Sequence, residues 1–197
     1  MSTKTDVDIL EVIRSRRSIG KVRPDPVPRD LVEQLLEAAV QAPNHHLTLP
    51  WRFCVLTGEA RADLGDLMAA GVRASLPDPE SDEGRFQLER ASAKAFRAPV
   101  IVVAGVHHET EDPVVRHENA LAGAAAVQNL LLAAHALGLG AMWRTGLPAY
   151  DPAVKAHFGL DQEDDLIGFV YVGYPAIQPV PRQHSYEDRT EWRGWSG

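Results

Sequence analysis

Apolar residues recur at helical spacing near the start of the chain. A helix is predicted over residues 6–14, with one apolar face. That face consists of Ile9, Leu10, Val12 and Ile13. Residues 20–28 contain three prolines and predict an extended connector, because each proline fixes its own backbone and restricts the residue before it. A second helix is expected from near Pro28, since proline suits a first helical turn. Its buried stripe consists of Leu31, Val32, Leu35, Leu36 and Ala39.

Residues 99–106 have the composition of a central strand. They form a continuous apolar run with four valines and one isoleucine, which is typical of a strand buried on both faces. Shorter strands are predicted at 51–57, 141–143 and 166–172. Further helices are predicted at 59–74, 85–96, 119–137 and 152–158, and the proline-containing segment 76–84 is expected to be a mobile excursion.

These elements do not alternate in the regular strand–helix–strand order of a doubly wound fold. We therefore expect an α+β fold with a mixed central sheet flanked by helices. The whole chain, 1–197, is predicted to be one domain in which 174–197 form an extended C-terminal tail. Alanines and Gly123 in the 119–137 helix permit close backbone approach, either at the centre of the fold or in a dimer.

Composition narrows the classes of function. The 197 residues carry a formal net charge of −7, and no basic tract indicates a nucleic-acid partner. The lone Cys54 indicates a reducing compartment, and its apolar neighbours favour a buried structural thiol. The sequence shows no signal peptide and no apolar stretch long enough to cross a bilayer. We expect a soluble, cytoplasmic protein that binds no membrane.

Two motifs suit the binding of a phosphate and of a flat ligand. Arg16-Arg17-Ser18 could grip a phosphate at a helix end, although a basic helix C-terminus that complements the helix dipole is the simpler alternative. Glycines in 138–146 let backbone approach a planar ligand, and Trp143 and Arg144 add a ring and a fixed charge. The alternative here is a glycine-capped helix followed by a packed tryptophan.

A third motif, residues 42–51, combines two prolines, an amide, two imidazoles and an indole. Adjacent histidines such as His45 and His46 rarely ligate one ion together, and no Cys or His stands at metal-ligand spacing from them. No metal site is therefore predicted. The second histidine pair, His107-His108, is interpreted as solvated surface.

Taken in order, these motifs resemble the nitroreductase family of flavoproteins, most closely its compact bacterial NAD(P)H nitroreductases. The resemblance spans most of the chain. It is carried by Arg16-Arg17-Ser18-Ile19, Ala42-Pro43-Asn44-His45-His46, Pro50-Trp51-Arg52-Phe53, Gly138-Leu139-Gly140, Trp143-Arg144 and Gly173-Tyr174-Pro175.

The resemblance implies an α+β fold, an obligate homodimer and one FMN at each subunit interface. Arg16, Arg17 and Ser18 would hold the phosphate and ribityl end. Gln41 and His45 would contact the cofactor across the interface or along the ribityl chain. Met142, Trp143 and Arg144 would line the flavin, and 135–140 is the implied nicotinamide region.

The predicted activity is therefore that of an FMN-dependent NAD(P)H oxidoreductase. Hydride would pass through FMN to a nitro-aromatic, quinone or similar small acceptor. No catalytic residue is assigned, because the flavin carries the chemistry. Gly20, where a further basic residue is frequent, and Thr48-Leu49 depart from the family pattern. Two alternatives stay open: a flavin-binding sensor or store without turnover, and a flavin-degrading or dehalogenating relative. The role of Arg182 also stays open.

Overall fold

The computed structural model describes residues 8–182 and 184–195, and its centre is a four-stranded sheet. The strands are β1 (Trp51–Thr57), β2 (Val100–Val106), β3 (Gly140–Arg144) and β4 (Asp165–Gly173), arranged in the order β1-β2-β4-β3. All three neighbouring pairs are antiparallel. The expectation of a mixed sheet is therefore wrong for these four strands, and the parallel pairing in the described residues is an isolated bridge between Ser18 and Ala141, outside them.

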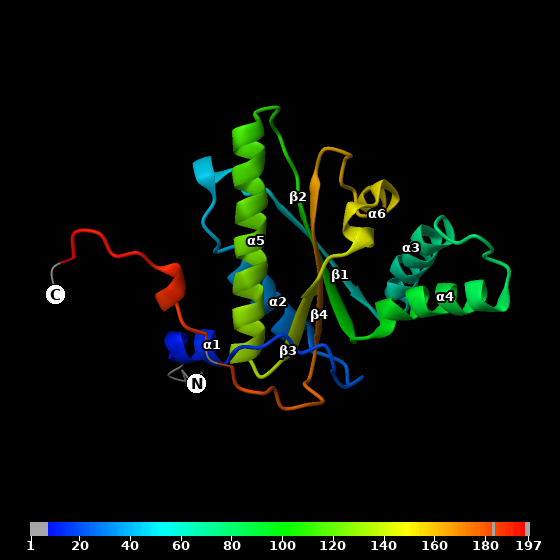
Figure 1. Cartoon of the computed structure of the whole chain (residues 1–197), viewed down its shortest axis with the longest axis horizontal. Coiled ribbons are helices and arrows are strands. Elements are labelled where there is room, and N and C mark those ends of the chain that lie inside the picture. The colour runs from blue at the N-terminus through cyan, green and yellow to red at the C-terminus, as the bar shows by residue number, and fades with distance from the viewer. Residues whose placement is uncertain (1–7, 183, 196–197) are drawn as a thin grey trace.

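Helices surround this sheet, as Figure 1 shows. The α-helices are α1 (Ile9–Ser15), α2 (Arg29–Ala39), α3 (Ala62–Arg73), α4 (Asp82–Ser92), α5 (Pro113–Ala136) and α6 (Pro152–His157). Short 3-10 helices are η1 (His45–Leu47), η2 (Gly58–Arg61), η3 (Ala93–Phe96), η4 (Leu147–Tyr150) and η5 (Glu187–Arg189). Helices and antiparallel strands together give the α+β class that the sequence predicts.

Capping residues explain where the helix boundaries differ from the predicted ones. Helix α5 begins at Pro113 rather than near residue 119, because the Asp112 carboxylate accepts a hydrogen bond from the Val114 N–H at 2.8 Å. Helix α4 begins inside the predicted excursion, because the Ser81 hydroxyl accepts from the Gly84 N–H. Asp8 caps α1 in the same way. Asp6, where that helix was expected to start, lies outside the described residues.

The core has two layers, one on each face of the sheet. Helices α2 and α5 cover the face that carries Val100, Val102 and Val170. Helices α3 and α6 cover the face that carries Ile101 and Phe169. Every residue of β2 is buried, which confirms the strand predicted from its continuous apolar run. No helix in the described ranges is long and apolar enough to cross a membrane.

Helix α1 does not bury the apolar face that its sequence predicts. Only Val12 is buried, whereas Ile9, Leu10 and Ile13 are 58%, 56% and 51% exposed. The residues do lie at helical spacing, but the described residues of one chain leave most of that face uncovered. An exposed cluster of large apolar side chains marks a surface that another molecule can cover.

Close packing of α5 on the sheet depends on Gly123. A Cβ atom there would lie 2.4 Å from Cγ2 of Val106 and 2.9 Å from Cγ1 of Ile167. The close approach expected of this glycine is therefore real, and it brings the helix backbone against both β2 and β4.

We predict that Gly123→Ala lowers the free energy of unfolding by about 1–3 kcal/mol, because overpacking outweighs the better helix propensity of alanine. Urea denaturation measures this change. Gly71→Ala is the matched control, since Gly71 is an exposed position of α3 and its added Cβ would meet only Oδ2 of Asp151 at 3.4 Å. The control is expected to gain up to about 1 kcal/mol. If Gly123→Ala and Gly71→Ala raised the free energy of unfolding equally, the packing account would be contradicted.

Candidate functional site

The structure brings the first and third sequence motifs together. The residues after α1 run beside β3, where Ser18 bridges Ala141 and the Ile19 N–H donates to the Ala141 carbonyl at 2.9 Å. Gly20 then lies against the side chains of Met142 and Arg144. Segments 16–20 and 140–144, which are far apart in the sequence, therefore form one continuous surface.

Residues 142–144 of that surface line a cavity of about 860 Å³. Met142, Trp143 and Arg144 of β3 form one wall, and Phe169 and Tyr171 of β4 extend it. The opposite side is made by α3, by Lys94 and Arg97 at η3, and by the segment 145–152. The cavity is thus lined by aromatic and apolar groups, three basic side chains and one carboxylate, that of Asp151, a combination that suits a planar anionic ligand.

Two side chains of the β3 wall differ in how well their polar atoms are satisfied. The indole Nε1–H of Trp143 donates to the Ile167 carbonyl at 2.9 Å, which fixes the ring. Arg144 is half-buried, and its Nε is buried with no hydrogen-bond partner among the described residues. Its guanidinium carbon lies 5.5 Å from the centroid of the Tyr171 ring. Burial raises the pKa of Tyr171, while the charges of Arg144 and Arg97 act against that rise.

Arg17 has a structural role in one chain. Its guanidinium donates to the backbone carbonyls of Arg14 at 2.6 Å, Arg16 at 2.7 Å and Arg182 at 2.5 Å. These bonds tie the end of α1 to the C-terminal tail. Arg16 and Ser18 make no side-chain hydrogen bond within the described residues, so these two are the freer groups for a phosphate.

His135, near the end of α5, supports the same corner. The Ser15 hydroxyl donates to the Glu11 carbonyl at 2.6 Å, so it accepts from Nε2–H of His135 at 2.8 Å. Burial lowers the pKa of His135, the charges of Arg16 and Arg17 lower it further, and Glu11 acts in the opposite direction. A neutral His135 therefore holds α1 against α5 beside two arginines.

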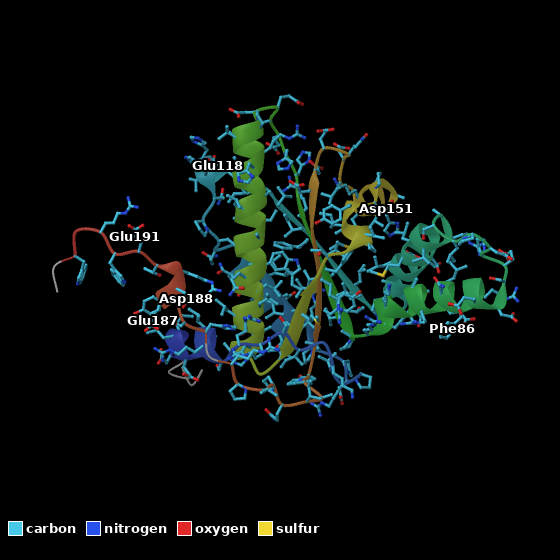
Figure 2. The ribbon with its side chains drawn as sticks, in the orientation of Figure 1. Phe86, Glu118, Asp151, Glu187, Asp188 and Glu191 are labelled. Atoms are coloured by element: carbon cyan, nitrogen blue, oxygen red, sulfur yellow. The ribbon has the colours of Figure 1, made fainter. Side chains whose placement is uncertain are left out.

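The middle motif lies elsewhere, near the other end of α5. Nδ1 of His45 lies 2.7 Å from a carboxylate oxygen of Glu118, which Figure 2 places in the N-terminal half of that helix. The Thr48 hydroxyl donates to Oδ1 of buried Asn119 at 2.7 Å. The imidazole of His46 stacks on that of His45 with 4.2 Å between ring centroids.

Backbone strain accompanies this anchoring. His46, Leu47 and Leu49 have φ values of 55°, 54° and 46°, in the left-handed region that side chains other than glycine rarely adopt. Such strain persists only where surrounding contacts hold it, and it is common at functional sites. The two bonds to Glu118 and Asn119 supply those contacts.

Within one chain, the predicted cofactor residues therefore form two separate groups. Glu118 and His135 stand seventeen residues apart on α5, which corresponds to about 25 Å along the helix axis. His45 lies at one end, and the surface formed by 16–20 and 140–144 lies at the other. Gln41 follows α2, is exposed, and donates only a long 3.4 Å bond to the Glu37 carbonyl.

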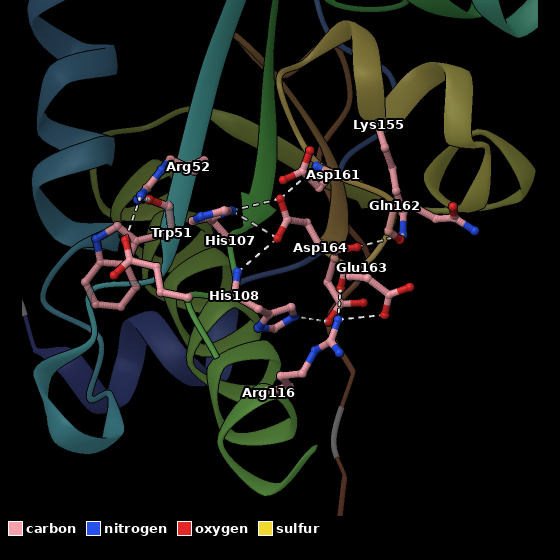
Figure 3. Close-up of polar contacts among 12 residues, drawn as sticks. Trp51, Arg52, His107, His108, Arg116, Lys155, Asp161, Gln162, Glu163 and Asp164 are labelled. Atoms are coloured by element: carbon pink, nitrogen blue, oxygen red, sulfur yellow. Dashed lines mark hydrogen bonds and ion pairs between the residues drawn. The ribbon is translucent and has the colours of Figure 1, made fainter. Parts of the chain in front are cut away.

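The interpretation of His107-His108 as solvated surface is wrong. The His108 side chain is only 2% exposed, and its Nε2 lies 2.9 Å from a carboxylate oxygen of Asp165. Nδ1 of His107 lies 3.0 Å from the nearer carboxylate oxygen of buried Asp164 (Figure 3). Both histidines follow β2, and their rings contact Asp164 and Asp165 at the start of β4, which is distant in the sequence and which the two histidines alone do not indicate.

Hydrogen bonds account for the geometry of this cluster without a metal ion. His107, Asp161 and Asp164 present ligand atoms within 4.8 Å of one another. Both carboxylate oxygens of Asp164 are nevertheless used, since they accept from His107, from the His108 N–H and from the Asp161 N–H. Burial raises the pKa of Asp164, but these hydrogen bonds more than offset it, so the pKa lies below its ordinary value. We interpret the cluster as a structural clamp on the loop before β4.

Several residues at the cavity and its supports were not singled out from the sequence. Tyr171 lies in a strand that reads only as apolar, and Lys94 and Arg97 follow a helix whose packing the sequence does not give. Glu118 lies just before the predicted 119–137 helix, and nothing beside it in the sequence indicates its contact with His45. None of them has a local signal, because each acquires its role from a partner distant in the chain.

Comparison with known proteins places this arrangement in a family. A model of the Nitroreductase family matches residues 13–174. The chain belongs to the Nitroreductase family. The matched region contains both groups of predicted site residues.

Relatives in this family resemble the chain over nearly its whole length. The Bacillus subtilis (strain 168) protein named "Putative NAD(P)H nitroreductase YfhC" is 34% identical over 91% of this chain and 91% of its own. The solved structure of a nitroreductase-like family protein from Bacillus cereus is 26% identical, with a TM-score of 0.81 over 98% of this chain and 100% of that one. A "putative nitroreductase in complex with fmn" from Desulfovibrio desulfuricans is also 26% identical, with a TM-score of 0.73 and the same coverage. The nitroreductase-like fold expected from the sequence is confirmed.

The lowered pKa of His135 predicts a pH dependence of stability. A histidine whose folded-state pKa lies below its ordinary 6.5 favours folding in its neutral form. The unfolding free energy therefore falls as the pH drops through about 6.5 toward the folded-state pKa. We expect the stability difference between wild type and His135→Asn to shrink between about pH 7.5 and about pH 5.5. Urea denaturation in phosphate-free buffer tests this, and a constant difference would contradict it.

Proposed function

We propose that the protein is an FMN-dependent NAD(P)H oxidoreductase that reduces small electron acceptors such as nitro-aromatics or quinones. The observation that supports this most directly is the half-buried Arg144, which lines the cavity without an acidic partner among the described residues. An unpaired charge in such a place is unfavourable unless a ligand completes its contacts. The relatives named as NAD(P)H nitroreductases, and one named with fmn, indicate which ligand.

The residues present fit FMN. Arg16 and Ser18 offer a guanidinium and a hydroxyl for its phosphate, close to the β3 wall. The cavity of about 860 Å³ has room for a planar ring system and a second flat molecule. Bound FMN would supply hydride chemistry, since it can accept two electrons from a nicotinamide and pass them to an acceptor.

The chain's own residues bind and orient rather than react. Trp143, fixed through its indole N–H, presents a rigid aromatic surface to the cavity. Arg17 and His135 hold the phosphate-binding segment in place through backbone and hydroxyl contacts. A shared open site with few specific polar groups suits an enzyme that accepts several flat substrates.

A homodimer is part of the proposal. His45 and the surface formed by 16–20 and 140–144 lie at opposite ends of α5, so a second, oppositely directed copy can supply His45 and Gln41 to the cavity. Large apolar side chains are available to cover such an interface. They include Ile9, Leu10 and Ile13 on α1, Val114 and Leu121 on α5, and Trp192 and Trp195 in the tail.

One observation supports a second candidate function, that of a flavin-binding protein without turnover. The loop that would approach the flavin offers Thr48 and Leu49, and the Thr48 hydroxyl is already bonded to Asn119. This loop therefore presents few free polar groups to a substrate.

The visible spectrum of the purified protein tests the proposal. We expect flavin absorption bands that bleach when NADH or NADPH is added without oxygen, and that return when a nitro-aromatic or quinone is added. Arg16→Ala should weaken FMN binding by at least about tenfold, because a charge-assisted phosphate contact contributes about 1.5–3 kcal/mol. Lys21→Ala, an adjacent change of the same charge, is the control.

Two other outcomes are informative. Flavin bands that persist with both nicotinamides would favour the binding protein without turnover. A colourless chain that takes up no added FMN would contradict the proposed function.

A further inference from the structure

Gly20 is required by space rather than by backbone conformation. Its φ is not in the left-handed region where glycine is favoured. A Cβ atom at this position, however, would lie 2.6 Å from Sδ of Met142 and 3.0 Å from Nη2 of Arg144. Both neighbours are the ends of flexible side chains, so a larger residue at position 20 would displace them rather than prevent folding.

The guanidinium that occupies this space has no acidic partner. The Arg144 side chain makes no ion pair or hydrogen bond within the described ranges 8–182 and 184–195, and its guanidinium lies over the face of Tyr171. The other charged groups lining the cavity are Lys94, Arg97 and Asp151. Asp151 is the cap of α6, where its carboxylate accepts from the Ala153 N–H at 2.9 Å. The cavity therefore carries excess positive charge, with Arg144 on the β3 wall.

We propose that Arg144 supplies the fixed positive charge that favours the reduced form of FMN in this cavity, and that Gly20 preserves the space in which its guanidinium lies. This inference rests on the proposed function. When FMN takes up two electrons and one proton, its neutral ring becomes an anion. A nearby guanidinium stabilises that anion more than the neutral ring, so it raises the reduction potential.

The midpoint potential of bound FMN, titrated with dithionite against a reference dye, measures this effect without turnover. Arg144→Ala should weaken the binding of reduced FMN relative to oxidised FMN by about tenfold. For a two-electron couple this ratio corresponds to a potential lower by about 30 mV. Arg144→Lys should retain part of the wild-type potential, because the charge is kept but the planar group is lost.

Position 20 gives an independent test that leaves the charge in the chain. Gly20→Ala should displace the ends of both Met142 and Arg144 and lower the potential through Arg144, whereas the same change in an Arg144→Ala background should have no further effect. Gly20→Lys combined with Arg144→Ala should restore the potential, because it returns a positive charge to the same space.

Arg23→Ala is the matched control. The Arg23 guanidinium also lies over a tyrosine, 5.2 Å from the Tyr174 ring centroid, but it does not line the cavity. Its loss changes the net charge equally and should leave the potential unchanged. If Arg144→Ala binds FMN with the potential of Arg23→Ala, the inference is wrong although the proposed function stands. If Arg144→Ala fails to fold, the midpoint potential of Gly20→Ala tests the inference in its place. A wild-type chain that binds no FMN would contradict both the inference and the proposed function.

Discussion

The packing of helix α5 against the sheet is the constraint on which the rest of the structure depends. Gly123 lets this 24-residue helix approach β2 and β4 so closely that a methyl group would not fit. Once the helix is fixed, its two ends fix two separate parts of the surface. His135 holds α1 at one end through Ser15, and Glu118 and Asn119 hold the strained loop 45–49 at the other.

Under the proposed function, this geometry leaves the site in one chain incomplete. The β3 wall lines the cavity and the segment 16–20 runs beside β3, but His45 stands about 25 Å away along α5. The apolar face of α1 is uncovered next to the same segment. A second copy can both bury that face and bring His45 to the cavity, so the proposed dimer accounts for two features that are unexplained in a single chain.

Local patterns in the sequence were sufficient for most of the fold. The run at 99–106 identified β2 because a strand buried on both faces needs no alternation, and 51–57 matched β1 in full. Helix starts were missed where a side-chain cap decides them, as Asp112 does for α5. The helical spacing of the apolar residues in α1 was predicted correctly. Such spacing cannot distinguish a face that packs on the core from one that stays exposed in a single chain.

The candidate site was predictable only in part, for a related reason. Arg16, Ser18, Trp143 and Arg144 belong to motifs, and the structure brings those motifs together. Tyr171, Glu118 and Gly20 acquire their roles from contacts with residues distant in the chain, and buried His108 likewise contacts the distant Asp165. The sequence contains those residues but not their distances.

The most direct test of the central claim is FMN stoichiometry in a hybrid of two variants, Arg16→Ala and His45→Ala, co-expressed with different tags. If each site uses Arg16 of one copy and His45 of the other, the hybrid contains one intact site and one doubly altered site. It should then bind one FMN per dimer with wild-type affinity, while both parent variants bind FMN more weakly at every site. A hybrid in which no site recovers wild-type affinity, or a protein that stays monomeric when saturated with FMN, would contradict the account.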